Sequence, residues 1–208
     1  MARNYQSDRK LADHYLIQIQ QILGPYVINI ASFECDARQA TDLVLIKNDI
    51  TIACRVRTPG YARIYGKEFT IRAQRDIGTE TELSKIRKGW AKWLFYCHLA
   101  GPCETEADKF KQFIAAWFLL DLNTFRQQLA AYPHLANPAI KPNGDGTWFA
   151  PFRFDAFPST LIIAQYWDDT AIAATPLPKS GQYKPKSYAE SLEMARKVDF
   201  SYQATPVS

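Results

Sequence analysis

The sequence is poor in the residues that build metal centres and disulfide frameworks. Its 208 residues include four cysteines and three histidines. Cys35, Cys54, Cys97 and Cys103 lie in four different contexts without C-x-x-C spacing, and the histidines form no H-E-x-x-H pair. Structural zinc needs closely spaced cysteine or histidine ligands. We therefore expect free thiols, structural or exposed histidines, and no zinc site.

Signals for two large enzyme classes and for membrane insertion are missing as well. The chain has no G-x-S-x-G elbow, and its Asn-Gly-Asp-Gly-Thr turn at 143–147 lacks the lysine of a phosphate-binding loop. The first fifteen residues are polar, and no apolar run approaches the roughly 18 residues that span a bilayer. We expect a cytoplasmic protein, in a bacterium or a virus-infected host cell, without a membrane partner.

What is present is a globular composition with a basic segment. Hydrophobic residues make up 47% of the chain and charged residues 22%, close to globular averages, and the formal net charge is +4. Ten basic residues fall within forty positions: Arg55, Arg57, Arg63, Lys67, Arg72, Arg75, Lys85, Arg87, Lys88 and Lys92. Such a run is typical of a solvated surface and also of a face that binds a polyanion. Both interpretations stay open at this point.

Hydrophobic periodicity predicts a helix followed by a strand meander in the first half of the chain. The helix covers residues 8–23, and residues 26–33 form a short strand or an extended connection. Two stretches rich in β-branched residues, 41–46 and 50–57, flank a three-residue turn and predict a β-hairpin. Residues 67–73 are expected to add the third strand of this meander.

A second helix and a buried strand are predicted next. Apolar residues at helical spacing predict this helix within residues 79–100, a segment that opens with a threonine N-cap. Its aromatic residues (Trp90, Trp93, Phe95 and Tyr96) are expected to face the core rather than to stack on bases. The continuous apolar run 113–122 predicts a central strand, and 122–132 predicts a short helix that begins near Asn123 or Thr124.

The C-terminal third differs in composition from the rest of the chain. Prolines and glycines punctuate short apolar pieces from about residue 136, which predicts one or two added strands. We divide the chain into a core at 1–135, an extension packed on the core at 136–175, and a tail at 176–208 with one short helix at 187–198.

The order helix, three strands, helix, strand over about residues 8–121 resembles the core of the PD-(D/E)XK nuclease superfamily. In that superfamily an acidic residue on the first hairpin strand and an acid-x-Lys pair on the second hold a divalent metal and activate water. Here Asp42 begins the first hairpin strand, and Arg55-Val56-Arg57 stands at the position of the acid-x-Lys pair. The resemblance implies a restriction-endonuclease-like α/β fold with a C-terminal strand extension. The segments TDLVLIKNDITIACRVR, EFTIR and TELSKIRKGWAKWLFY also resemble phage-associated hypothetical proteins.

The motif is degenerate, because an arginine cannot ligate a metal. A second carboxylate would have to come from Glu34 or Asp36, before the first hairpin strand, or from Glu68 at the start of the third strand. Acids in such loops also serve as turn formers, and Asp42 is equally suited to capping nearby backbone. Arg57 could replace the family lysine as a phosphate clamp, since a guanidinium donates bidentate hydrogen bonds.

We therefore expect a nuclease-like protein directed at nucleic acid, and whether it is an enzyme stays open. In the catalytic version Asp42, with Glu34 or Asp36, holds Mg²⁺, and Arg57 stabilises the negative charge that develops on phosphate. The predicted nucleic-acid contacts are Arg55, Arg57, Arg72 and Lys85. The first alternative is a catalytically silent factor, for example a viral one, that binds nucleic acid or a protein partner. The second is a structural or assembly protein.

Overall fold

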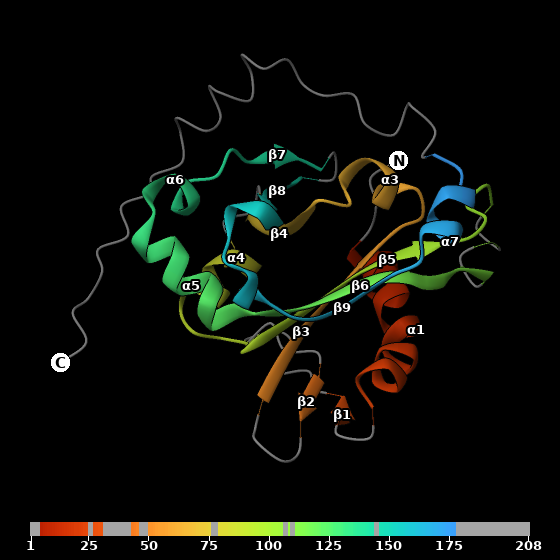
Figure 1. The fold of residues 1–208 in the computed structure, drawn as a ribbon, viewed down its shortest axis with the longest axis horizontal. Coiled ribbons are helices and arrows are strands. Elements are labelled where there is room, and N and C mark those ends of the chain that lie inside the picture. The colour runs from red at the N-terminus through yellow and green to blue at the C-terminus, as the bar shows by residue number, and fades with distance from the viewer. Residues whose placement is uncertain are drawn as a thin grey trace.

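The computed structural model places the chain in two β-sheets that pack against each other, with helices around them (Figure 1). It describes residues 5–24, 27–30, 43–45, 50–75, 79–105, 108, 111–143 and 146–177. The elements follow in this order: α1 (Tyr5–Leu23), β1 (Val27–Ile30), β2 (Leu43–Leu45), β3 (Ile50–Arg57), α3 (Tyr61–Tyr65), β4 (Glu68–Arg75), α4 (Glu82–Arg87), β5 (Trp93–Ala100), β6 (Phe113–Asp121), α5 (Leu122–Ala131), α6 (Pro133–Ala136), β7 (Lys141–Pro142), β8 (Thr147–Arg153), η2 (Phe154–Ala156), η3 (Ser159–Leu161), β9 (Ile162–Trp167) and α7 (Asp169–Ala174). The predicted mixed α/β class is confirmed. None of the described helices has the length and apolar character needed to cross a membrane.

Six strands form the main sheet, in the order β1-β2-β3-β5-β6-β9. β1, β2 and β3 are antiparallel neighbours, and Val44 lies opposite Thr51, which confirms the predicted strand pairing of the hairpin. β5 then runs parallel to β3, whereas β6 and β9 continue antiparallel. Parallel neighbours need a long crossover connection. Here the crossover contains α3, β4 and α4.

The third strand of the meander was predicted wrongly. β4 does not pair with β3. It pairs with β8, which lies about 80 residues later in the chain, and together with β7 they form a second sheet in the order β4-β8-β7. The meander does exist, but its members are β1, β2 and β3. The reason is that β5 already occupies the free edge of β3, and α3 carries the chain away from that edge before β4 begins.

The helix predicted at 79–100 is also wrong in its second half. α4 ends at Arg87, and Gly89 and Ala91 both have positive φ, at 94° and 52°, which no α-helix accommodates. The chain then extends as β5, whose residues from Leu94 to Ala100 are all buried. A strand covered on both faces is apolar at every position, so its sequence also satisfies a helical pattern. The exposed Trp90 lies in the turn between the two elements.

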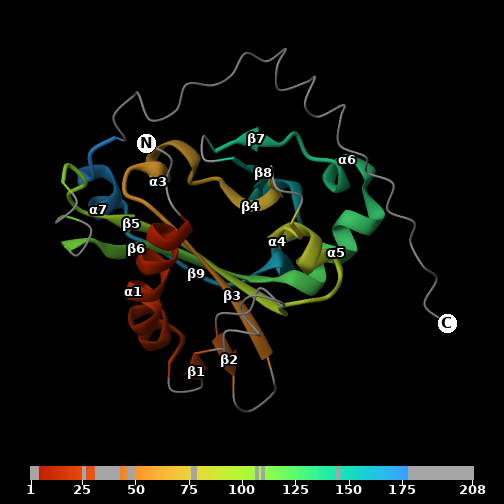
Figure 2. The same ribbon diagram turned by 180° about the vertical axis from the view of Figure 1, so that it is seen from behind.

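The two faces of the main sheet carry separate cores. α1 packs Tyr15 and Ile19 against one face, over Ile52, Phe95 and Cys97 (Figures 1 and 2). The second sheet and helices α4 and α5 cover the opposite face. The ring of Phe69 on β4 lies at the centre of this larger core and contacts five other aromatic rings, which are those of Tyr96, Phe125, Phe152, Phe154 and Phe157. Buried side chains on the opposite face of β3 and β5, such as Ala53, Leu94 and Tyr96, therefore belong to the core beneath the second sheet.

The strand predicted at 113–122 and the helix after it are confirmed as β6 and α5. The helix begins directly after the strand, at Leu122, close to the predicted start at Asn123 or Thr124. Its cap is Asp121, whose carboxylate accepts a hydrogen bond from the Asn123 N–H at 2.7 Å. Beyond residue 136, β8 joins one sheet and β9 joins the other. The divisions at residues 135 and 175 stay predictions, and the helix predicted at 187–198 lies outside the described residues.

Gly66, directly after α3, lies against the indole of Trp167. A Cβ atom on Gly66 would collide with Trp167 Cη2 and would lie 2.6 Å from the Ala62 carbonyl oxygen. We expect Gly66→Ala to lower the free energy of unfolding by about 1–3 kcal/mol, because the indole packs between α3 and Phe118. Urea unfolding followed by tryptophan fluorescence measures the change. In a Trp167→Phe background the cost should shrink, and an equal cost would contradict this explanation.

Candidate functional site

Arg55 and Arg57, the two arginines of the degenerate motif, lie on the same face of β3. Cys54 and Val56 point into the α1 core, whereas Ala53 belongs to the core beneath the second sheet. Because side chains alternate along a strand, both arginines share the face with Ala53, as predicted. On β5, Tyr96 lies beside Arg55 and His98 lies beside Arg57. The candidate site is therefore a polar region on the covered face of the main sheet.

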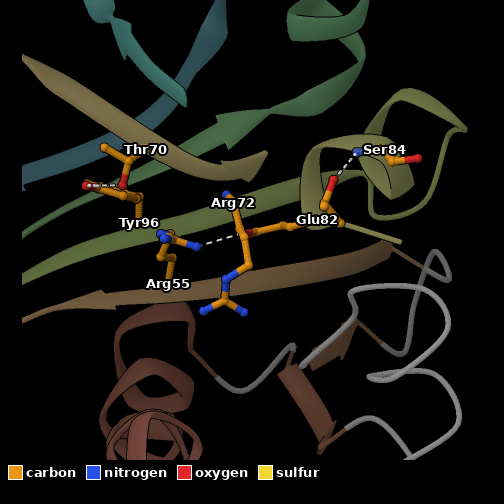
Figure 3. A network of polar contacts seen from close by, with 7 residues as sticks. Arg55, Thr70, Arg72, Glu82, Ser84 and Tyr96 are labelled. Atoms are coloured by element: carbon orange, nitrogen blue, oxygen red, sulfur yellow. Dashed lines mark hydrogen bonds and ion pairs between the residues drawn. The ribbon is translucent and has the colours of Figure 1, made fainter. Parts of the chain in front are cut away.

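Arg55 is held in an internal ion pair. Its Nη1 lies 2.6 Å from Oε2 of Glu82, and the two side chains are only 15% and 17% exposed. The same carboxylate oxygen accepts a hydrogen bond from the Arg72 N–H at 3.1 Å. Figure 3 shows the Glu82 side chain reaching from α4 to lie between Arg55 and the backbone of Arg72. One carboxylate thereby ties together β3, β4 and α4.

The start of α4 explains the position of Glu82. Thr81 is the N-cap, and its hydroxyl oxygen accepts a hydrogen bond from the Ser84 N–H at 3.3 Å. Glu82 follows in the first turn, where a negative charge is favoured by the helix dipole. A threonine cap is confirmed, as predicted. It starts α4 so that the Glu82 side chain, in the first turn, reaches β3 and β4.

Arg57 has a different environment. Its guanidinium carbon lies 4.9 Å from the centroid of the Tyr61 ring, which is a cation–π arrangement. No carboxylate among the described residues forms an ion pair with Arg57. Gly60, with φ of 85°, turns the chain so that Tyr61 comes back over the strand it has just left. Arg57 is therefore a half-buried cation that is positioned by an aromatic ring rather than neutralised.

His98, the neighbour of Arg57 on β5, is completely buried. Its ring lies edge-on to Tyr96 and Trp167, at centroid distances of 5.3 and 6.2 Å, and neither of its nitrogens has a hydrogen-bond partner among the described residues. Burial, and then the positive charge of Arg57, lowers the pKa of His98 from 6.5 to about 3. The imidazole is therefore neutral at physiological pH.

Tyr96 completes the row of polar side chains between the sheets. Its hydroxyl lies 3.4 Å from the hydroxyl of Thr70 on β4, and both residues are buried (Figure 3). This contact bridges the main sheet and the second sheet. A buried hydroxyl needs such a partner, because an unpaired one would cost about 1–3 kcal/mol.

Some of the predicted site residues lie within the described part of the chain, and others lie outside it. Arg55 and Arg72 meet at the Glu82 carboxylate, Lys85 lies one turn further along α4, and Arg57 lies two residues from Arg55. The predicted metal ligands Asp42, Glu34 and Asp36 lie outside the described residues. Glu68, the further candidate, begins β4 in the second sheet, opposite Arg153 of β8. Within the described ranges, no three histidine, cysteine, aspartate or glutamate residues gather as a metal site would require.

Four residues of this site were not predicted from the sequence as functional: Glu82, Tyr61, His98 and Thr70. The threonine cap at Thr81 indicated that Glu82 would lie in the first turn of a helix. It could not indicate the ion-pair partner of Glu82, which is Arg55, 27 residues away in the chain. His98 was predicted to end a helix and instead lies inside a strand. Comparisons with protein-family models, curated proteins and solved structures gave no match.

Proposed function

We propose that this chain is a nuclease-like protein that binds nucleic acid through the β3 face, with Arg57 as a phosphate contact. The observation that carries the proposal is the state of Arg57. It is a guanidinium without a carboxylate partner among the described residues, held in place by Tyr61 at the end of a strand. A fixed, unneutralised guanidinium is suited to the bidentate recognition of phosphate.

The order of elements supports a restriction-endonuclease-like core. α1, the antiparallel strands β1 to β3, a crossover with helices, and β5 follow one another as in the resembled superfamily, and β3 and β5 are adjacent. One departure is the presence of β4 within the crossover. In the sequence, Asp42 immediately precedes β2, the strand that pairs with β3.

The described half of the site does not suit a divalent cation. Arg55 stands where the superfamily has a carboxylate ligand, and the nearby carboxylate of Glu82 is already bound by Arg55 and by a backbone N–H. A cation beside Arg55 would meet a positive charge. We therefore derive no catalytic step through a metal, and this observation favours the second candidate function, a catalytically silent nucleic-acid-binding factor.

Binding is tested by removing the charge of Arg57. We expect Arg57→Ala to weaken the binding of a labelled oligonucleotide about tenfold and to lower the slope of log affinity against log salt by about one, because one phosphate contact is lost. Arg57→Lys should restore the slope but only part of the affinity. Lys141→Ala removes one exposed cation from β7 and serves as the charge-matched control. Identical isotherms for Arg57→Ala and Lys141→Ala would contradict the proposal.

Catalysis is tested separately with Asp42→Asn, which removes a ligand charge and nearly preserves shape. Cleavage of labelled DNA or RNA that needs Mg²⁺ or Mn²⁺ and disappears in Asp42→Asn would support the nuclease. Binding by the wild-type chain without cleavage under any of these conditions would support the silent factor.

A further inference from the structure

The short helix α3 carries an aromatic stack at the rim of the molecule, next to α7 (Figures 1 and 2). Tyr61 and Tyr65 are four residues apart, so they lie on the same side of the helix. Their rings are stacked, with centroids 5.9 Å apart and planes inclined by 30°. Because Arg57 lies over the Tyr61 ring, the three side chains form one series, which we call the Arg57–Tyr61–Tyr65 stack.

This stack is not part of the packed core. Both tyrosines are only partly buried, the intervening Ile64 is 53% exposed, and only Ala62 of α3 is fully buried. Neither tyrosine hydroxyl makes a hydrogen bond within the described part of the chain, and neither is a buried unpaired atom. Among the described residues, the two rings are held by stacking on each other.

The chain segment that carries the stack is basic. The thirteen residues from Arg55 to Lys67 contain four cationic side chains and no carboxylate. Arg55 is bound to Glu82, and Arg63 donates a hydrogen bond to the Thr175 carbonyl oxygen. Arg57 and the exposed Lys67 form no ion pair with a described residue. Arg57 lies over the Tyr61 ring, and Lys67, which interacts electrostatically with Asp155, follows Tyr65 by two residues, so the segment offers two cations to a negatively charged ligand.

We infer that this face binds an unpaired nucleic-acid strand, with a base stacked on the Arg57–Tyr61–Tyr65 stack and phosphates near Arg57 and Lys67. In a duplex the faces of the bases are covered by their neighbours, whereas a single strand offers them to aromatic side chains. The inference rests on the proposed function and deepens it by naming single strands as the ligand.

The experiment measures fluorescence anisotropy of labelled oligonucleotides with the full chain at one fixed salt concentration. The probes are a single-stranded oligothymidylate and an oligouridylate of about 15 nucleotides, and a DNA duplex of the same length. We expect both single strands to bind more tightly than the duplex. Tyr61→Leu and Tyr65→Leu keep an apolar side chain, and each should weaken single-strand binding about tenfold. Tyr65→Leu should leave duplex binding unchanged, whereas Tyr61→Leu also frees Arg57 from its aromatic contact and is compared on the single strands alone.

Two variants serve as controls. Tyr61→Phe keeps the ring and should bind like the wild type, and Tyr166→Leu removes a tyrosine from β9 that is 50% exposed, more than either tyrosine of the stack, and should have no effect. Unchanged single-strand binding in both leucine variants, with Arg57→Ala still impaired, would overturn the stacking inference and leave the proposed function standing. If the wild-type chain bound none of the three probes, the proposed function itself would fall.

Discussion

At about pH 4 the chain should be less stable than at about pH 7 by about 3 kcal/mol on account of His98 alone. The pKa of this residue falls from 6.5 to about 3 on folding, so between these values the unfolded chain binds a proton that the native state does not. Stability therefore rises with pH in this window, by about 1.4 kcal/mol per pH unit, and is lost as the pH falls from 6.5 toward 3.

The comparison with a non-titrating variant isolates this contribution from that of the carboxylates. His98→Gln is neutral throughout, so its free energy of unfolding, measured by urea titration at several pH values, should vary less steeply than that of the wild type below pH 6.5. His134→Gln alters an exposed histidine on α6 and should keep the wild-type dependence. Parallel curves for the wild type and His98→Gln would show that His98 is not buried in its neutral form.

Substitution Glu82→Ala should lower the free energy of unfolding by about 2–4 kcal/mol. It leaves the guanidinium of Arg55 without its carboxylate in a setting that is only 15% exposed, and it removes the acceptor of the Arg72 N–H. Urea unfolding monitored by circular dichroism gives the change. The control is Glu80→Ala, which breaks the exposed ion pair with Lys88 and should cost less than about 1 kcal/mol.

A double substitution tests whether the unpaired charge is the cause. Arg55→Met combined with Glu82→Leu replaces the pair by apolar side chains, and it should recover most of the stability lost in Glu82→Ala. If the double variant were as unstable as Glu82→Ala, the loss would come from the unpaired Arg72 N–H or from the first turn of α4 rather than from Arg55.

Arg55 and Arg57 lie on the same strand, β3, and have two different roles. Arg55 is neutralised by Glu82 and joins three elements, so its main effect is on stability. Arg57 forms no ion pair with a described carboxylate and is oriented by Tyr61, and the proposed binding uses its charge. Replacing both at once would mix a folding defect with a binding defect, and for this reason the binding test changes Arg57 alone.

Local pattern was sufficient for several elements. The period of α1 and its end before Gly24, the pairing of β2 with β3, the apolar run of β6 and the helix that follows it were all predictable, because each depends on residues close together in the chain. The alternation that places Arg55 and Arg57 on one face was also predictable, since it follows from strand geometry alone.

Tertiary structure decided the rest. The residues of β5 satisfy a helical pattern, and only burial on both faces, together with the positive φ of Gly89 and Ala91, makes them a strand. The sequence of β4 contains no pattern that predicts pairing with β8, far away in the chain, instead of pairing with β3. The ion pair of Arg55 with Glu82 depends on the same crossover, and His98 packs against Trp167 of β9, about 70 residues later in the chain. Such contacts join residues that are distant in sequence, and their formation depends on the packing of the whole fold rather than on any local propensity.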